Sequence, residues 1–274
     1  MTVVLFAALL HASWNALIKA CGDKLLMTWL LCVYAGVLAA LFLPFLPSPQ
    51  RESWGHLAAS GTIHLLYFWL VSRAYQSADM SLAYPLMRGA APILTALIAV
   101  IVFAEPLSVW AWLGIALLCG GVITLALQAA GAAALSRTAW QPAISNAGVI
   151  VLYTLIDGAG ARLAGDAAAY ACWLFVLTAL PMVLMFPVMR ARWRISRRDV
   201  LPRGAIAGAC SLVSYGLALW AMTQSPVALV AALRETSVLF GALLAALLLH
   251  EKFGAARWAA AGLVAAGAAL FKIA

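Results

Sequence analysis

The stretch RGAAPILTALIAVIVFAE, residues 88–105, has a counterpart later in the same chain. The second copy reads RETSVLFGALLAALLLHE and covers residues 234–251. In each copy a glutamate follows an arginine after 17 positions (88 to 105, 234 to 251), and the copies lie 146 positions apart (88 to 234). Trp112 matches Trp258 and Gly121 matches Gly267 at the same offset. These matches in a single register predict an internal duplication.

The composition indicates a helical membrane protein. Of the 274 residues, 66% are hydrophobic and 9% are charged, and the mean hydropathy is +1.02. A soluble domain has about 45–50% apolar and about 25% charged residues. We therefore predict an all-α, multi-pass integral membrane protein embedded in the lipid bilayer, expected in the inner (plasma) membrane of a bacterium.

The net charge of +8 does not indicate nucleic-acid binding, because much of the excess lies in one connection between apolar runs. That connection carries Arg190, Arg192, Arg194, Arg197, Arg198 and Arg203. Such a cluster is typical of a cytoplasmic loop facing anionic head groups, and it places both termini outside. The five cysteines show no metal-ligand spacing, so we expect neither a metal nor a cofactor.

Ten apolar runs are long enough to cross a bilayer, which takes about 20 residues. The predicted spans are 2–20, 25–46, 55–75, 81–104, 107–128, 142–162, 167–189, 204–223, 227–249 and 254–272. Residues 129–141 form the expected linker between a first repeat, 1–128, and a second repeat, 142–274. Because five spans is an odd number, the second half enters the membrane from the opposite side. The sequence thus predicts two inverted five-helix repeats, which recur in secondary transporters with a substrate site between the halves.

Prolines interrupt two of these predicted spans. Pro85 and Pro92 lie inside the fourth, and Pro181 and Pro187 lie inside the seventh. Each proline removes a backbone donor, so we expect both helices to kink or to leave carbonyl groups free.

Four charged residues fall well inside predicted spans, where charge is costly and marks candidate functional residues. Arg88 and Arg234 are expected to face a central cavity and bind an anionic group, or to pair with a carboxylate there. The alternative is an arginine held by backbone carbonyls that joins the halves. Asp157 and Glu235 are candidates for proton coupling or for binding a cationic group. Glu235 is alternatively the ion-pair partner of Arg234 or Arg88.

Aromatic and polar side chains supply the other candidates for a substrate site. His11, Trp14 and Asn15 share one helical face, because positions three and four apart are neighbours. Tyr67, Tyr84 and Tyr153 are candidate aromatic lining residues, and His11 and His64 are further candidates for proton coupling. Less specific candidates for the lining are Trp69, Tyr215 and Trp220. Glu105 and Glu251 end their predicted helices and are expected to be caps or gate contacts. Gly158 and Gly160 beside Asp157 predict a close helix approach or a locally opened backbone.

At these residues the chain resembles the drug/metabolite transporter superfamily, specifically its EamA-type members. The resemblance rests on HASWNALIK (11–19), SLAYPLMRGAAP (81–92) with Glu105, and ALRETS (232–237) with Glu251. It implies a ten-helix bundle with a central cavity, acting as a secondary carrier that often exports amino acids or other small metabolites. Relatives usually have both termini in the cytoplasm, in conflict with the charge distribution.

The leading prediction is a secondary active transporter, an exporter or exchanger, for a small polar or zwitterionic metabolite such as an amino acid. The alternative within this class is a multidrug or organic-cation transporter. An intramembrane enzyme is disfavoured, because no His-Glu-x-x-His, Gly-x-Ser-x-Gly or Gly-x-Gly-Asp stretch is present, and so we predict no catalytic residues. A channel would need a filter loop or rings of charge, which are not apparent. Gly204 and Gly208 match the small-xxx-small pattern of helix packing. The pattern fits packing inside one molecule or between two, so the protein is expected to be a monomer or a weak homodimer.

Overall fold

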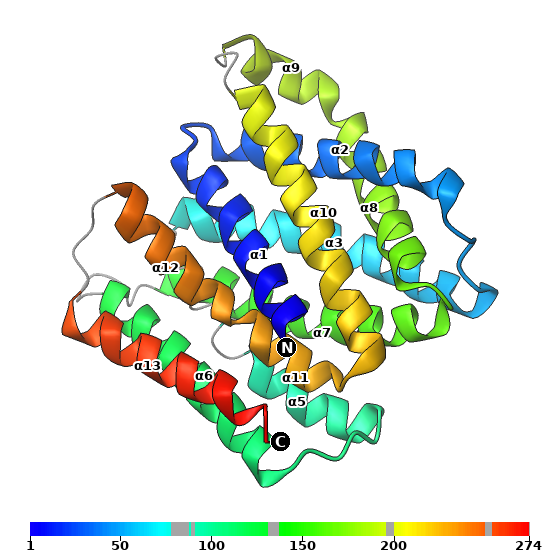
Figure 1. Ribbon diagram of the computed structural model, residues 1–274. Helices are drawn as coiled ribbons and strands as arrows, with labels where there is room; N and C mark the ends of the chain where they lie inside the picture. Colours follow the sequence, from blue (N-terminus) through cyan, green and yellow to red (C-terminus); the bar gives the residue numbers. More distant parts are fainter. Residues whose placement is uncertain (78–87, 89–90, 131–136, 196–199, 250–253, 274) are drawn as a thin grey trace.

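The structure is a computed structural model that describes all residues except 78–87, 89–90, 131–136, 196–199, 250–253 and 274. Every regular element in the described part is helical, which confirms the all-α prediction (Figure 1). The first half contains α1 (Thr2–Ala20), α2 (Lys24–Phe42), α3 (Trp54–Ser77), α5 (Ala91–Val102) and α6 (Val109–Ala130), with 3-10 turns at Leu43–Phe45 and Arg51–Ser53. The second half contains α7 (Arg137–Leu163), α8 (Ala167–Leu184), α9 (Phe186–Ile195), α10 (Val200–Gln224), α11 (Val227–Arg234), α12 (Thr236–Leu249) and α13 (Ala255–Leu270).

Six segments of the described chain are long and apolar enough to cross a membrane: Thr2–Ala20, Lys24–Phe45, Ile144–Leu163, Ala167–Leu184, Val200–Gln224 and Val227–Leu244. Three further helices contribute shorter apolar stretches: Ala91–Val102, Val109–Leu125 and Trp258–Leu270. The 24-residue helix α3 belongs to neither group, since its histidines and hydroxyl residues lower its hydropathy. The protein is therefore a multi-pass membrane protein, whereas the predicted number of ten spans is not confirmed.

Two predicted spans consist of two helices each. The span predicted at 167–189 is α8 followed by α9, with Met185 between them, and Pro187 lies in the first turn of α9, where proline is tolerated. The span predicted at 227–249 is α11 followed by α12, with Glu235 between them. The Glu235 N–H donates to the Ala232 carbonyl three residues back, which tightens the last turn and ends α11.

The other prolines of the fourth and seventh predicted spans differ in setting. Pro181 lies inside α8, three residues before its last residue, Leu184. Pro92 is the second residue of α5, in a first turn where the missing N–H costs little. Pro85 lies outside the described residues.

The predicted linker at 129–141 is mostly helical where it is described. α6 runs on to Ala130 and α7 begins at Arg137, five residues before the predicted start at 142. Alanine is the strongest helix former, so an alanine-rich segment extends a helix more readily than it ends one. Residues 131–136 of the linker lie outside the described part.

α6 and α13, which occupy equivalent positions in the two halves, lie side by side (Figure 1). Equivalent residues of the two helices make the same contacts with the opposite helix. A Cβ atom on Gly121 would lie 2.8 Å from the carbonyl oxygen of Ala260, and a Cβ on Gly267 would lie 2.6 Å from that of Gly114. Positions 114 and 260 are counterparts at the offset of 146, as are 121 and 267. The glycines matched in sequence therefore allow the same close backbone approach from both sides.

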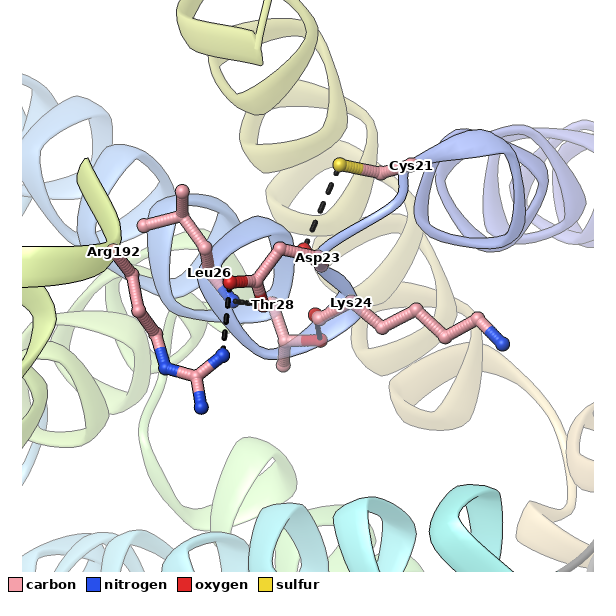
Figure 2. Close-up of polar contacts among 6 residues, drawn as sticks. All are labelled: Cys21, Asp23, Lys24, Leu26, Thr28 and Arg192. Atoms are coloured by element: carbon pink, nitrogen blue, oxygen red, sulfur yellow. Dashed lines mark hydrogen bonds and ion pairs between the residues drawn. The ribbon is translucent and has the colours of Figure 1, made fainter. Parts of the chain in front are cut away.

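Asp23 joins the turn between α1 and α2 to α9 (Figure 2). Its Oδ1 accepts a hydrogen bond from the Leu26 N–H at 3.0 Å, which caps α2, and its Oδ2 accepts one from Arg192 Nη1 at 2.9 Å. The thiol of Cys21 donates to the backbone oxygen of Asp23 at 3.5 Å. Partial burial acts to raise the pKa of Asp23, but the hydrogen bonds from Leu26 and Arg192 outweigh it and hold this pKa below its ordinary value.

A second polar network lies at the other end of α10. Glu105 accepts a hydrogen bond from the Val227 N–H at 2.9 Å, at the start of α11, and pairs with Arg162 at 2.6 Å. Arg162 also donates to the carbonyl groups of Met222 and Ser225, at 2.8 and 3.1 Å. Glu105, for which a cap or a gate contact was predicted, thus binds the first N–H of a helix in the other half of the chain. Glu251 lies outside the described residues.

Candidate functional site

A cavity of about 60 Å³ lies between the two halves, and seven helices of the described part line it. Its described lining comes from α1, α2 and α3 in the first half and from α7, α8, α10 and α11 in the second. The lining residues are His11, Trp14, Leu31, Cys32, His64, Tyr67, Tyr153, Leu174, Phe175, Thr178, Ser211, Tyr215 and Arg234. The wall is thus largely aromatic and aliphatic, and no carboxylate belongs to the described lining.

Arg234 brings a positive charge to this cavity. It is the last residue of α11, and its side chain reaches the cavity next to the point where the helix is interrupted. Its guanidinium carbon lies 5.0 Å from the centre of the Tyr215 ring, within the range of a cation–π contact. Among the described lining residues, Arg234 alone carries a formal charge when the histidines are neutral.

Arg88 and Glu235 form a buried ion pair between the two copies of the duplicated stretch. Arg88 donates from Nε to Glu235 Oε2 at 3.0 Å and from Nη2 to Oε1 at 2.5 Å. Only 4% and 3% of the two side chains are exposed. A two-pronged contact of this kind is the strongest geometry for an arginine and a carboxylate. It neutralises Arg88, while the arginine that corresponds to it in the second copy, Arg234, faces the cavity.

Asp157 lies in α7 behind the cavity wall and is fully buried. Its Oδ1 accepts a hydrogen bond from the Tyr170 hydroxyl at 2.9 Å, and its Oδ2 accepts one from the Tyr215 hydroxyl at 2.5 Å. A Cβ on Gly160 would lie 2.4 Å from the Tyr170 hydroxyl oxygen, so glycine is needed there for this tyrosine to approach. Gly160 thus allows a side chain of α8 to approach α7 beside Asp157, in line with the first of the two alternatives predicted for its glycines.

A cluster of rings surrounds the rest of the cavity. The His64 ring lies 4.6 Å from that of Tyr153 and 6.2 Å from that of Tyr67, centre to centre. His64 Nδ1 lies 2.9 Å from the backbone oxygen of Ser60 and 3.1 Å from its hydroxyl. These faces present negative π density, which suits either a cationic group or an apolar body.

The His11 ring contacts that of Trp14 edge-on at 4.7 Å, on the α1 side of the cavity. The neighbouring polar residue, Asn15, donates to the His11 carbonyl at 2.8 Å, within the same helix. Asn15 thus shares the helical face predicted for it but does not belong to the described lining.

Comparison with known proteins identifies the family. The family described as the EamA-like transporter family matches residues 1–127 and, a second time, residues 148–273. The chain belongs to this family. A solved crystal structure is similar to 99% of this chain over 98% of its own length, with a TM-score of 0.74 and 20% identity, a likeness that shows the fold alone. Among curated proteins, none matches the chain.

As an EamA-like protein, the chain is a transporter of the drug/metabolite type with a two-repeat architecture, as the resemblance implied. Membership of a transporter family argues against the alternatives of an intramembrane enzyme and a channel. Within the described residues, no three histidine, cysteine, aspartate or glutamate side chains are grouped so that they could hold a metal ion.

The candidate residues of this EamA-like protein fall into two groups. The lining includes His11, Trp14, His64, Tyr67, Tyr153 and Arg234, whereas Asn15, Arg88, Asp157 and Glu235 lie outside it. Tyr84 is not among the described residues. Trp69 and Trp220 are 57% and 48% exposed and do not belong to the lining, because they point outward from their helices.

Sequence reasoning missed several residues of the wall and its support. These are Ser60, Tyr170, Phe175, Thr178 and Ser211. Only Tyr170 had a signal in the sequence, since a glycine beside a buried acid indicates that another side chain approaches it. The remaining residues have no charge or motif to distinguish them from ordinary residues of a membrane helix.

Proposed function

We propose that this EamA-like protein is a secondary active transporter of a small zwitterionic metabolite, such as an amino acid, whose carboxylate binds Arg234. The observation that carries the proposal is the unequal treatment of the two duplicated arginines. Arg88 is neutralised by Glu235, while Arg234 faces a cavity whose described lining has no carboxylate. An anionic group on the substrate is the natural partner for this remaining charge.

The chemistry of the wall matches the rest of a zwitterion. A guanidinium binds a carboxylate through two parallel hydrogen bonds. The ring faces of Trp14, Tyr67 and Tyr153 suit an ammonium group through cation–π contacts. Leu31 and Leu174 add apolar surface for a side chain.

An organic cation, the alternative substrate class, fits the same aromatic rings but not Arg234. A simple cation would meet a like charge in a confined site. The two carboxylates that favoured this alternative, Glu235 and Asp157, are engaged by Arg88 and by two tyrosines. The arrangement therefore favours a ligand that itself carries a carboxylate.

We propose that the two halves are inverted copies and that transport results from their movement around this cavity. The protein would act in export or exchange across the inner membrane. The symmetric contact of α6 with α13 supports a two-fold relation between them, and inverted-repeat transporters characteristically bind substrate at interrupted helices. The cavity, at about 60 Å³, is smaller than the roughly 300–1,000 Å³ of ordinary ligand pockets. Binding a metabolite thus requires the helices to separate.

Proton coupling through Asp157, Glu235, His11 or His64 stays a prediction. It is tested by measuring transport with and without a pH gradient.

A thermal-shift screen in detergent tests the substrate class. Each amino acid is compared with the amine that lacks its carboxylate and with the acid that lacks its ammonium group. Saturation at about 100 times Kd adds about 2.7 kcal/mol of stability, enough for a clear rise in Tm. We expect zwitterions to give the largest rise and amines the smallest. The rise should disappear in Arg234→Gln and persist in the control Arg190→Gln, which removes an exposed arginine of α9. Stabilisation by the amines alone would replace the zwitterion with the organic cation.

A further inference from the structure

Asp157 has both carboxylate oxygens occupied by tyrosine hydroxyls, and it has no exposed surface. A buried charge is tolerated where it is paired or fully hydrogen-bonded. Asp157 has its hydrogen-bonding capacity used by these tyrosines, and it lies behind the wall and outside the described lining. It is therefore poorly placed to touch a substrate. Its effect on the cavity passes through the groups that it holds.

One of those groups, Tyr215, reaches the cavity and lies beneath Arg234. Its hydroxyl donates to Asp157 at 2.5 Å, and its ring centre lies 5.0 Å from the Arg234 guanidinium carbon. The three residues come from α7, α10 and α11, so the contacts run from one helix to the next. Fixing the hydroxyl oxygen fixes the long axis of the ring, since that oxygen lies on this axis, and the position of the ring limits where the guanidinium can lie.

The glycines around Asp157 reinforce this arrangement. Gly160 leaves the space that the Tyr170 hydroxyl occupies, so that a second hydrogen bond holds the carboxylate. A Cβ on Gly158 would lie 2.8 Å from Val227 Cγ2, at the first residue of α11. The segment 157–160 therefore sets both the ring under Arg234 and the start of the helix that ends in Arg234.

We propose that Asp157 is a positioning residue for substrate recognition, which orients the Arg234 guanidinium toward the substrate carboxylate by fixing Tyr215. This rests on the proposed function, because it assumes a ligand with a carboxylate. Asp157 sets selectivity for that group without touching the ligand. It differs from a direct cation-binding role, which would place the Asp157 carboxylate against the substrate ammonium.

A double-mutant cycle tests this role. The ligands are the amino acid that stabilises the protein most and the matched amine and acid. The variants are Asp157→Asn, Tyr215→Phe and the two combined, with Tyr34→Phe as a tyrosine control outside the described cavity lining. Hydrogen bonds to a charged group are worth enough to change affinity about tenfold. We expect Kd for the amino acid and for the acid to rise about tenfold in each single variant and not appreciably further in the double variant. Kd for the amine and for every ligand with Tyr34→Phe should stay unchanged.

The outcomes separate this proposal from the proposed function. If Arg234→Gln abolishes binding while Asp157→Asn and Tyr215→Phe leave Kd unchanged, or if their effects multiply in the double variant, the positioning role is overturned. A selective loss of amine affinity would make Asp157 a direct cation ligand and overturn it as well. If no ligand with a carboxylate binds the wild type, both proposals fall. Should Asp157→Asn not fold, Tyr215→Phe, which keeps the ring, decides the question alone.

Discussion

The chemistry of the candidate site depends on a single difference between the two copies of the duplicated stretch. Arg88 is followed by Gly89, whereas Arg234 is followed by Glu235. The two copies thus contain two arginines but one adjacent carboxylate, and Glu235 pairs with Arg88 across the repeat interface, not with its neighbour in sequence. The asymmetry was visible in the sequence. Which arginine would line the cavity was not, because that depends on where α11 ends and how its last turn faces.

The buried pair of Arg88 and Glu235 gives the first prediction. Removing one partner from a buried ion pair leaves an uncompensated charge and costs about 3–5 kcal/mol. Arg88→Met and Glu235→Met should each lower Tm in detergent strongly. The combined variant should be more stable than either single one, because no charge is then left alone. Single variants with wild-type Tm would contradict a mutual pairing.

Asp23 gives a prediction of pH dependence. Its folded pKa lies below the ordinary value, so the contact with Arg192 stabilises the folded state above the unfolded pKa of about 3.9. That contribution is lost as the pH falls through the lowered folded pKa. Unfolding of wild type and of Asp23→Asn, which keeps a helix-capping side chain, should differ at pH 7 and converge toward pH 3. Because the pair is partly exposed, the difference should be small and should shrink in high salt. A difference independent of pH would contradict this reading.

At the scale of the helices, adjacent glycines in α6 provide a matched test of the repeat interface. A Cβ on Gly121 would lie 2.8 Å from the backbone of α13, whereas one on Gly120 would meet nothing within 4 Å. Overpacking a tight contact costs about 1–3 kcal/mol, while alanine at an open helical site gains up to about 1 kcal/mol over glycine. Gly121→Ala should lower Tm, and Gly120→Ala should maintain or raise it. Equal effects would show that α6 and α13 are not in close contact.

Helix positions were predicted well where apolar runs are bounded by polar residues, as for α1 and α3. A kink in the span that breaks at Met185 was expected from Pro181 and Pro187, whereas the break at Glu235 was not predicted, because no glycine or proline lies beside it. Such a break is decided by packing and by the i−3 hydrogen bond of the last turn, neither of which local composition reveals. At the predicted linker, the described residues 129–130 and 137–141 belong to α6 and α7, because alanine-rich sequence favours helix.

At the scale of the whole molecule, the two halves meet in an arrangement that repeats under their exchange. α1 packs on α10, and the counterparts of these helices, α7 and α3, also pack together. The cavity draws its wall from both halves, so movement of one against the other changes its shape and access. The helical class, the duplication and the family could be predicted because they depend on composition and spacing. The role of Asp157 could not, because it depends on Tyr170 and Tyr215, which come from two other helices.

Uptake into sealed vesicles reconstituted with the protein tests the role of Arg234 in transport most directly. The measurement is the initial rate for the amino acid that stabilises the protein most, with wild type, Arg234→Gln and the surface control Arg190→Gln. We predict a rate at least about tenfold lower for Arg234→Gln, since a charge-assisted contact with the substrate is lost, and a wild-type rate for Arg190→Gln. Transport by Arg234→Gln at the wild-type rate, or wild-type transport of the carboxylate-free amine as fast as of the amino acid, would contradict carboxylate recognition by Arg234.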